Sequence, residues 1–167
     1  MSYWCPKPEG STSDIHSKKS ILKQIISVKT NINWETILTR LQNYPNEACE
    51  KDKFGVTALH NVIRKERQQH LSNRTNKIPM EIFELLIKEC PQSVEYSDSM
   101  TGRNALHIAC SGQCSDDMKD VVGMMLDLKR ETAMHLCHDG RLALHKCNEA
   151  EIAKRLIEIY PDGVSTK

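Results

Sequence analysis

The chain has 167 residues, a length that suits one domain with a buried core. Its 23 lysines and arginines balance 22 aspartates and glutamates, so the formal net charge of +1 provides no strong field to attract nucleic acid or an acidic membrane. Aromatic residues make up only 5% of the chain, which argues against an extended surface for stacking bases.

The first segment is polar and has no hydrophobic periodicity. Residues 1–14 contain two prolines, Gly10 and a cluster of serines and a threonine, which predicts a disordered tail. Tyr3 and Trp4 could anchor a short linear motif there, or could fold back onto the domain. The start of the chain does not resemble a secretory signal, and no apolar run is long enough to span a bilayer. We therefore expect an intracellular protein, cytoplasmic or nuclear, that is not inserted in a membrane.

Helical patterns begin at residue 15, so we place a single domain at 15–167. Apolar residues over 15–28 predict a first helix, which is interrupted at about 30–33. Asn33 is a good N-cap for a second helix with an apolar stripe. That helix should end at Tyr44, because a residue before proline is pushed out of the helical region.

The same ending recurs further along the chain. A helix over 80–89 should stop at Cys90-Pro91, and one over 151–159 should stop at Tyr160-Pro161. A further helix is expected over 118–129, where no proline follows. The predicted fold class is therefore all-α, built from helix pairs with loops between them.

Three segments carry nearly the same six residues: Gly, two variable positions, then Ala-Leu-His. They lie at 55–60, 102–107 and 140–145, and each follows a polar loop. The glycine fits a turn that needs a positive φ, Thr57 and Asn104 can cap the helix that follows, and the alanine and leucine should turn into the core. The residues assigned to this structural motif are Gly55, Leu59, His60, Gly102, Leu106, His107, Gly140, Leu144 and His145.

These segments resemble the Thr-Pro-Leu-His-x-Ala signature of ankyrin repeats, with alanine in place of proline. The Tyr-Pro and Cys-Pro endings are similar to divergent ankyrin repeat proteins of diatoms and related algae. The resemblance implies a short ankyrin-like helical repeat solenoid with finger loops between helix pairs, in units near 33–56, 57–103, 104–141 and 142–167. It also implies that the three motif histidines are structural, with ring nitrogens bonded to backbone across adjacent finger loops.

The chain departs from the family in the spacing of its motifs, which exceeds the usual period of about 33 residues. The polar stretch 68–77 should form a protruding loop, and the loop around 112–115 should be lengthened. The chain stops where another finger loop would begin, so either the last helix caps the stack or more repeats follow.

Repeat proteins of this kind bind partners through loop tips and the inner-helix face, so the resemblance predicts a non-catalytic module that binds a protein partner. Phe54, Tyr96 and Met100 would be its anchors, although they could instead pack between finger loops. Arg67 lies on the same helix as three of the polar candidates and could face the same groove. The candidate partner-binding residues are Phe54, Asn61, Arg64, Lys65, Tyr96, Met100 and His138.

No catalytic pattern is present in the sequence: it has no Gly-rich phosphate loop, nucleophile elbow or HExxH. We therefore expect neither catalytic residues nor a cofactor. A regulatory fragment of a larger enzyme or channel is an alternative that the sequence leaves open.

The seven cysteines are an odd number in a chain without an export signal, which predicts free thiols. A zinc- or redox-responsive sensor is a second alternative, because cysteines and histidines are dense over 110–147. Cys110 and Cys147 fall at matching core places in two motifs, so they are not expected to be ligands. The remaining Cys114, His135, Cys137 and His138 form no regular pairing, and no metal site is predicted.

Overall fold

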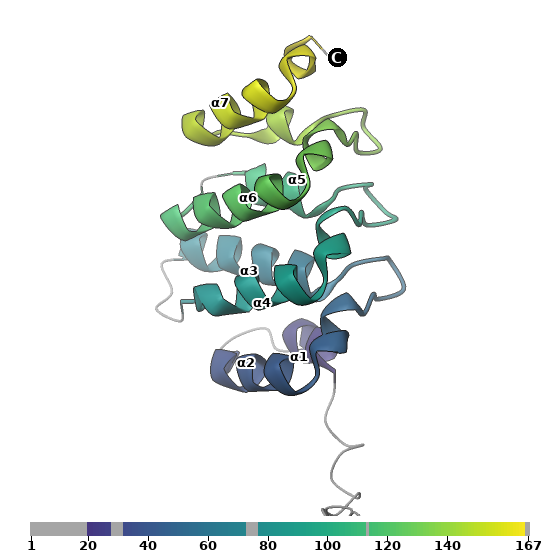
Figure 1. Ribbon diagram of the computed structural model, residues 1–167, viewed down its shortest axis with the longest axis vertical. Helices are drawn as coiled ribbons and strands as arrows, with labels where there is room; N and C mark the ends of the chain where they lie inside the picture. The colour runs from purple at the N-terminus through teal and green to yellow at the C-terminus, as the bar shows by residue number, and fades with distance from the viewer. Residues whose placement is uncertain (1–19, 28–31, 73–76, 113, 166–167) are drawn as a thin grey trace, which may run out of the picture.

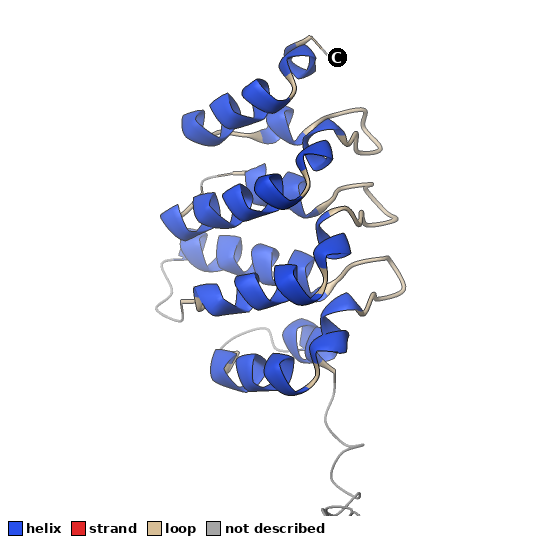
Figure 2. Ribbon diagram, viewed as in Figure 1, coloured by secondary structure: helices blue, strands red, loops and turns tan. Residues whose placement is uncertain are grey.

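The computed structural model describes residues 20–27, 32–72, 77–112 and 114–165, and these residues form an all-α fold. The predicted tail at 1–14 lies outside them. Within the described ranges the only β pairing is in isolated bridges (Figure 2).

Two kinds of helix occur in the described residues. The α-helices are α1 (Ile21–Ser27), α2 (Trp34–Asn43), α3 (Ala58–Ser72), α4 (Met80–Glu89), α5 (Ala105–Cys110), α6 (Asp116–Leu128) and α7 (Ala150–Ile159). Short 3₁₀-helices lie between or after them: η1 (Pro45–Cys49), η2 (Pro91–Val94), η3 (Arg130–Met134), η4 (Ala143–Lys146) and η5 (Pro161–Val164).

The helices pack in two columns along the long axis of the molecule (Figure 1). In one column α1 contacts α3, α3 contacts α5, and α5 contacts η4; in the other α2 contacts α4, and α4 contacts α6. The loops that carry Gly55, Gly102 and Gly140 extend to the same side of these columns (Figure 2). We call these loops, residues 50–57, 96–104 and 135–142, the finger loops.

The predicted helix boundaries are confirmed where the signal is local. The Asn33 side chain accepts a hydrogen bond from the backbone of Thr36 at 3.1 Å, and Asn104 accepts from that of His107 at 3.0 Å. Helices α2, α4 and α7 end just before a residue that precedes proline, and a 3₁₀-helix begins at each proline. The fixed φ of proline suits this first position, where no amide donor is needed.

Some boundaries differ from the prediction. Helix α3 runs through Ser72, so the predicted loop over 68–77 is wrong for residues 68–72. That stretch is polar, but it contains no glycine or proline to end a helix. Residues 73–76 lie outside the described ranges. Helix α6 starts at Asp116, earlier than expected, because the Ser115 hydroxyl accepts from the backbone of Met118 at 3.2 Å. The third Ala-Leu-His segment forms the short η4 rather than an α-helix.

One continuous core runs between the columns. Leu59 and Leu106 are fully buried in it, while Leu144 is only partly buried against its edge. Each helix is too short to be stable alone, so its apolar face depends on the neighbouring helices in its column. None of the helices within the described ranges combines the length and hydropathy that a membrane span requires.

The prediction of seven free thiols is wrong for one pair. Cys49, at the end of η1, and Cys90, which follows α4, form a disulfide with a Cα–Cα distance of 5.3 Å. They lie far apart in sequence, and packing of α4 against η1 brings them together. Cys110, Cys114, Cys137 and Cys147 are free thiols, and Cys5 lies outside the described residues.

Truncation of Leu106 should test the assigned packing. Leu106→Ala is expected to lower the free energy of unfolding by about 2–5 kcal/mol, because it leaves a cavity in the middle of the core. Leu128→Ala, at a residue that is 42% exposed, is the matched control and should change stability by less than about 1 kcal/mol. Urea unfolding of both variants gives the comparison, and equal losses would contradict the packing of α5.

Candidate binding groove

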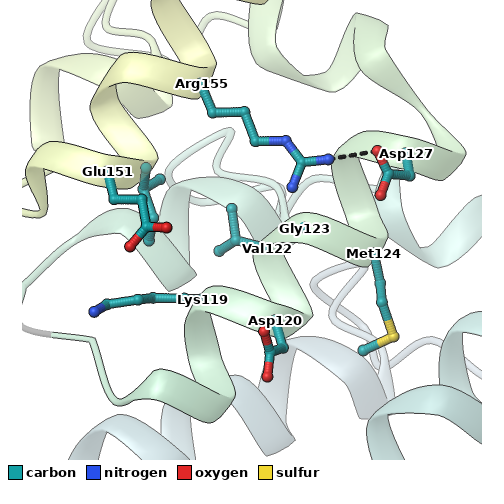
Figure 3. A pocket seen from close by; sticks show the side chains of 9 residues that line it. Lys119, Asp120, Val122, Gly123, Met124, Asp127, Glu151 and Arg155 are labelled. Carbon is teal, nitrogen blue, oxygen red and sulfur yellow. Dashed lines mark hydrogen bonds and ion pairs between the residues drawn. The ribbon is translucent and has the colours of Figure 1, made fainter.

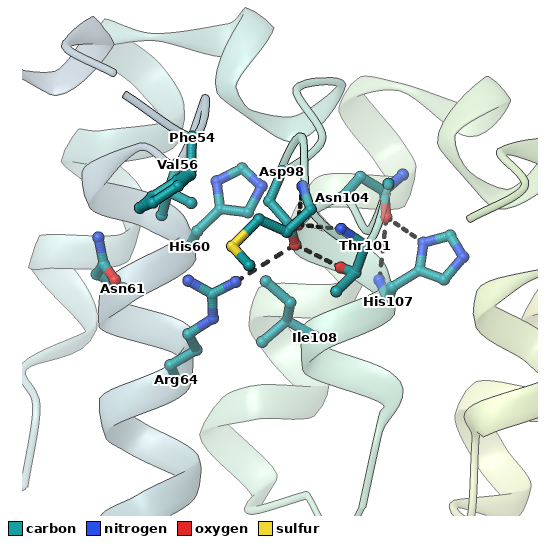
Figure 4. Close-up of polar contacts among 12 residues, drawn as sticks. Phe54, Val56, His60, Asn61, Arg64, Asp98, Thr101, Asn104, His107 and Ile108 are labelled. Atoms are coloured by element: carbon teal, nitrogen blue, oxygen red, sulfur yellow. Dashed lines mark hydrogen bonds and ion pairs between the residues drawn. The ribbon is translucent and has the colours of Figure 1, made fainter. Parts of the chain in front are cut away.

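A groove of about 370 Å³ lies between helix α3, the first two finger loops and helix α5. Its walls combine apolar side chains with three arginines, two aspartates and two hydroxyl groups (Figure 4 shows part of it). The lining residues are Asp52, Phe54, Val56, Arg64, Arg67, Asp98, Met100, Thr101, Arg103, Ile108 and Ser111.

The first finger loop is held by an aspartate and turned by a glycine. Asp52 Oδ1 accepts hydrogen bonds from the backbone amides of Phe54 at 2.8 Å and Val56 at 2.9 Å. Gly55 has a φ of 77°, a conformation that side-chain-bearing residues rarely adopt. This turn leaves the Phe54 ring at the loop tip, 36% exposed beside the groove.

The second finger loop repeats this construction. Asp98 Oδ1 accepts from the amides of Met100 at 3.1 Å and Thr101 at 2.6 Å, and its Oδ2 accepts from the Thr101 hydroxyl at 2.7 Å. Burial opposes the charge of Asp98, but the bonds from Thr101 outweigh it and lower the pKa of the carboxyl below its ordinary value. The loop is joined to the first one by the Ser99 amide, which donates to the Phe54 carbonyl at 2.8 Å. Met100 is left 70% exposed.

Two of the motif histidines connect an inner helix to the next finger loop, as the sequence predicts. His60 Nε2 lies 2.9 Å from the carbonyl oxygen of Tyr96, which can only accept, so Nε2 carries the proton. Its Nδ1 then accepts from the Thr57 hydroxyl at 2.8 Å. His107 Nε2 lies 3.0 Å from the Arg141 carbonyl in the same way.

His145 differs from the other two. Its ring is exposed, and Nδ1 accepts from the Leu142 amide at 3.0 Å. No further finger loop lies beside it within the described ranges, so the expected bond across loops is not made there.

The predicted binding residues divide into three that line the groove and four that do not. Phe54, Arg64 and Met100 line it. Tyr96 is half-buried against the core. The Lys51 ammonium lies 3.1 Å from the centre of the Tyr96 ring, so Tyr96 packs between the first two finger loops.

The other three predicted residues lie around the groove rather than in its lining. Asn61 is half-buried and donates to the Thr57 carbonyl at 3.2 Å. Lys65 is also half-buried on α3. His138 is exposed in the third finger loop, where its ring Nδ1 lies 3.3 Å from the carbonyl oxygen of Met100.

Sequence reasoning missed Arg103 and Ile108 as groove residues. Arg103 occupies a variable position of the repeated segment, and Ile108 directly follows His107, so both were considered only as parts of the motif. Their proximity to α3 arises from the contact between α3 and α5. That contact could have been expected from stacking of equivalent helices.

The arginines of the groove are held by long-range contacts. Arg67 Nη1 donates to the Ile108 carbonyl at 3.1 Å and to the Ser111 hydroxyl at 2.6 Å. Arg64 Nη2 lies 3.5 Å from Asp98 Oδ2, and Arg103 pairs with Asp139 at 3.8 Å. Since each guanidinium carries five donors, these contacts leave donors for an added acceptor.

A second groove of about 370 Å³ lies in the other column, between α6 and α7 (Figure 3). Arg155 crosses it and pairs with Asp127. A Cβ at Gly123 would lie 2.9 Å from Arg155 Nη1, so a side chain there would shift the end of Arg155. The charged residues of this groove are of both signs, Lys119 and Arg155 against Asp120, Asp127 and Glu151, and neither Phe54 nor Met100 lines it.

Within the described residues no group of three or more histidine, cysteine or acidic side chains is placed to hold a metal ion. Cys137 and His135 lie in the third finger loop, where His135 Nε2 donates to the Gly102 carbonyl at 2.8 Å. Cys114 instead lies near Cys110 and Cys147.

Searches against protein-family models and against curated proteins return no match to this chain. Any assignment of function therefore depends on the geometry of the grooves and on the sequence pattern.

Acidification should destabilise the fold through its buried histidines. Burial, followed by the charge of Arg64, lowers the pKa of His60 from 6.5 to about 4. As the pH falls, His60 is therefore protonated in the unfolded chain before it is protonated in the folded one. The stabilisation is complete above pH 6.5 and is lost progressively between 6.5 and 4. The free energy of unfolding should drop by about 2 kcal/mol between pH 7 and pH 5 from His60 alone.

Burial also lowers the pKa of His107, which adds to the same slope. Urea unfolding at the two pH values measures the effect, with His60→Gln as the test variant and His138→Gln as an exposed control. A pH dependence that persists unchanged in His60→Gln would contradict the assignment.

Proposed function

We propose that this protein is a non-catalytic binding module of the ankyrin-like repeat type, which holds a protein partner in the groove between α3, α5 and the first two finger loops. The observation that carries the proposal is the placement of exposed Phe54 and Met100 beside three arginines in one groove. Exposed aromatic and methionine side chains next to arginine are typical of surfaces that bind proteins.

The recurrence of equivalent contacts supports the repeat part of the proposal. The helix after each of the first two glycine turns carries a buried histidine that bonds a carbonyl of the next finger loop. Helices at equivalent sequence positions also lie in the same column. An ankyrin-like solenoid accounts for both features, because each unit then contacts mainly its neighbours.

The charges of the groove favour a partner segment that combines a carboxylate with an apolar side chain. Hydrogen bonds from their own loops reach Asp52 Oδ1 and both oxygens of Asp98, and Asp98 Oδ2 also lies 3.5 Å from Arg64 Nη2. The arginines retain donors in a planar arrangement that matches a carboxylate. An apolar side chain of the partner would pack on Phe54 and Met100.

Selection from a random peptide library displayed on phage tests this proposal directly. Wild-type protein should enrich peptides that contain aspartate or glutamate beside an apolar residue. The double variant Phe54→Ala/Arg64→Glu should bind those peptides with an affinity at least about tenfold lower, because it removes an anchor and reverses a charge.

A matched control changes the same kinds of residue elsewhere. Leu128→Ala/Arg155→Glu alters an exposed apolar residue and an arginine of the second groove, and should bind the selected peptides as wild type does. Circular dichroism verifies that both variants are folded. The proposal fails if no peptides are enriched, or if the enriched peptides bind Phe54→Ala/Arg64→Glu as tightly as wild type.

A further inference from the structure

Three free cysteines gather where α5 meets the segment after η4. Cys110 is the last residue of α5, Cys114 lies in the connection to α6, and Cys147 directly follows η4. Isolated β-bridges pair the backbone of Cys147 with Ser111 and with Gly112, so the residues after Cys110 lie against Cys147. Two elements far apart in sequence thus hold these sulfurs together.

The members of this cluster differ in exposure and in charge. Cys110 is fully buried, whereas Cys147 is only half-buried. A hydrogen bond from the Cys110 thiol favours the Cys147 thiolate and lowers the pKa of Cys147 to about 7, although burial and the charge of Glu149 oppose it. The same bond, together with burial, raises the pKa of Cys110. At neutral pH the accessible sulfur is therefore the nucleophile, and the buried one remains a thiol.

Arg67 places a positive charge near two of the three cysteines. Its charge favours the thiolate forms of both Cys110 and Cys114, although burial still raises the pKa of Cys114 to about 11. Cys147 itself is a partly exposed sulfur with a buried thiol as donor, a setting in which cysteines react with oxidants.

We propose that Cys147 and Cys110 form an oxidation site at which a hydroperoxide converts the two thiols into a disulfide between α5 and the segment after η4. In the first step the Cys147 sulfur attacks one peroxide oxygen; the S–O bond forms, the O–O bond breaks, and the leaving hydroxide takes a proton to become water. In the second step the Cys110 sulfur attacks the Cys147 sulfur. The S–S bond forms, the S–O bond breaks, and the hydroxyl leaves as water with the Cys110 proton.

Two thiols thereby lose two electrons, and one hydrogen peroxide is reduced to two waters. None of the three cysteines lines the binding groove, although Arg67 and Ser111 lie between the groove and the cysteines. Cys147 is the residue that oxidant meets first, and Cys110 is the residue that completes the bond.

Mass spectrometry of the oxidised full chain tests the site. The protein is fully reduced, freed of reductant and treated with hydrogen peroxide at neutral pH, and the remaining thiols are then blocked with N-ethylmaleimide. Trypsin, which cleaves after lysine and arginine, places Cys147 in the peptide 147–154 and both Cys110 and Cys114 in the peptide 104–119. The expected product is a cross-link between these two peptides, with Cys137 in 131–141 still blocked as a free thiol.

Variants assign the partner within the shared peptide. Cys114→Ser should retain the cross-link, whereas Cys147→Ser and Cys110→Ala should lose it. In Cys110→Ala the sulfenic acid at Cys147 should accumulate and react with dimedone, which labels that oxidation state. Recovery of the Cys49–Cys90 cross-link in every sample shows that the chain is folded and that the oxidant was active.

The result is separable from the binding function. Phe54→Ala/Arg64→Glu should form the cross-link as wild type does, whatever its effect on peptide binding. The proposal is overturned if Cys147 remains blocked by N-ethylmaleimide once Cys49–Cys90 has re-formed, or if the cross-link disappears in Cys114→Ser. Labelling of Cys137 by dimedone as fast as Cys147 would overturn it too.

Discussion

The bond from a buried histidine to a carbonyl of the following finger loop is the contact on which the rest of this fold depends. His60 reaches Tyr96 in this way, and His107 reaches Arg141. The opposite ring nitrogen lies against the residue that begins the same helix, Thr57 or Asn104. One neutral ring therefore fixes a helix start and the next loop together. The ring has to remain uncharged, since burial makes the imidazolium costly.

This contact also determines where the groove lies. With its carbonyl held by His60, the second finger loop runs beside the first, and the Ser99 amide bonds the Phe54 carbonyl. Phe54 and Met100 are then neighbours across two loops that share a direction. Asp52 and Asp98 hold the tips of their own loops, and Phe54 and Met100 at these tips remain exposed.

Local signals explain what the sequence could predict. Prolines 45, 91 and 161 end helices through their own geometry, and Asn33 and Asn104 cap helices within a few residues of themselves. The positive φ of Gly55, Gly102 and Gly140 likewise belongs to single residues. The sequence placed Phe54 and Met100 at loop tips but left open whether they pack between the loops, as Tyr96 does. Each of these inferences needed no knowledge of which helices become neighbours.

The features that could not be predicted depend on which helices become neighbours. The Cys49–Cys90 disulfide joins residues whose proximity arises only when α4 packs on η1. Cys110 and Cys147 occupy equivalent positions in two segments, which predicts a shared core role. In a stack, however, equivalent positions of neighbouring segments also lie next to each other, and Cys147 pairs with the residues that follow Cys110.

The charge of the groove follows from the same division between local and long-range bonds. Asp52 and Asp98 set two negative charges against the three arginines of the lining, and Asp98 lies beside Arg64. Loop amides and the Thr101 hydroxyl bond Asp52 Oδ1 and both oxygens of Asp98, so the two acids also shape the turns. Arg67, by contrast, is held by a carbonyl and a hydroxyl, which carry no net charge to neutralise it. Arg64 and Arg103 each lie beside an aspartate, so Arg67 is the groove arginine whose charge no carboxylate in these contacts offsets.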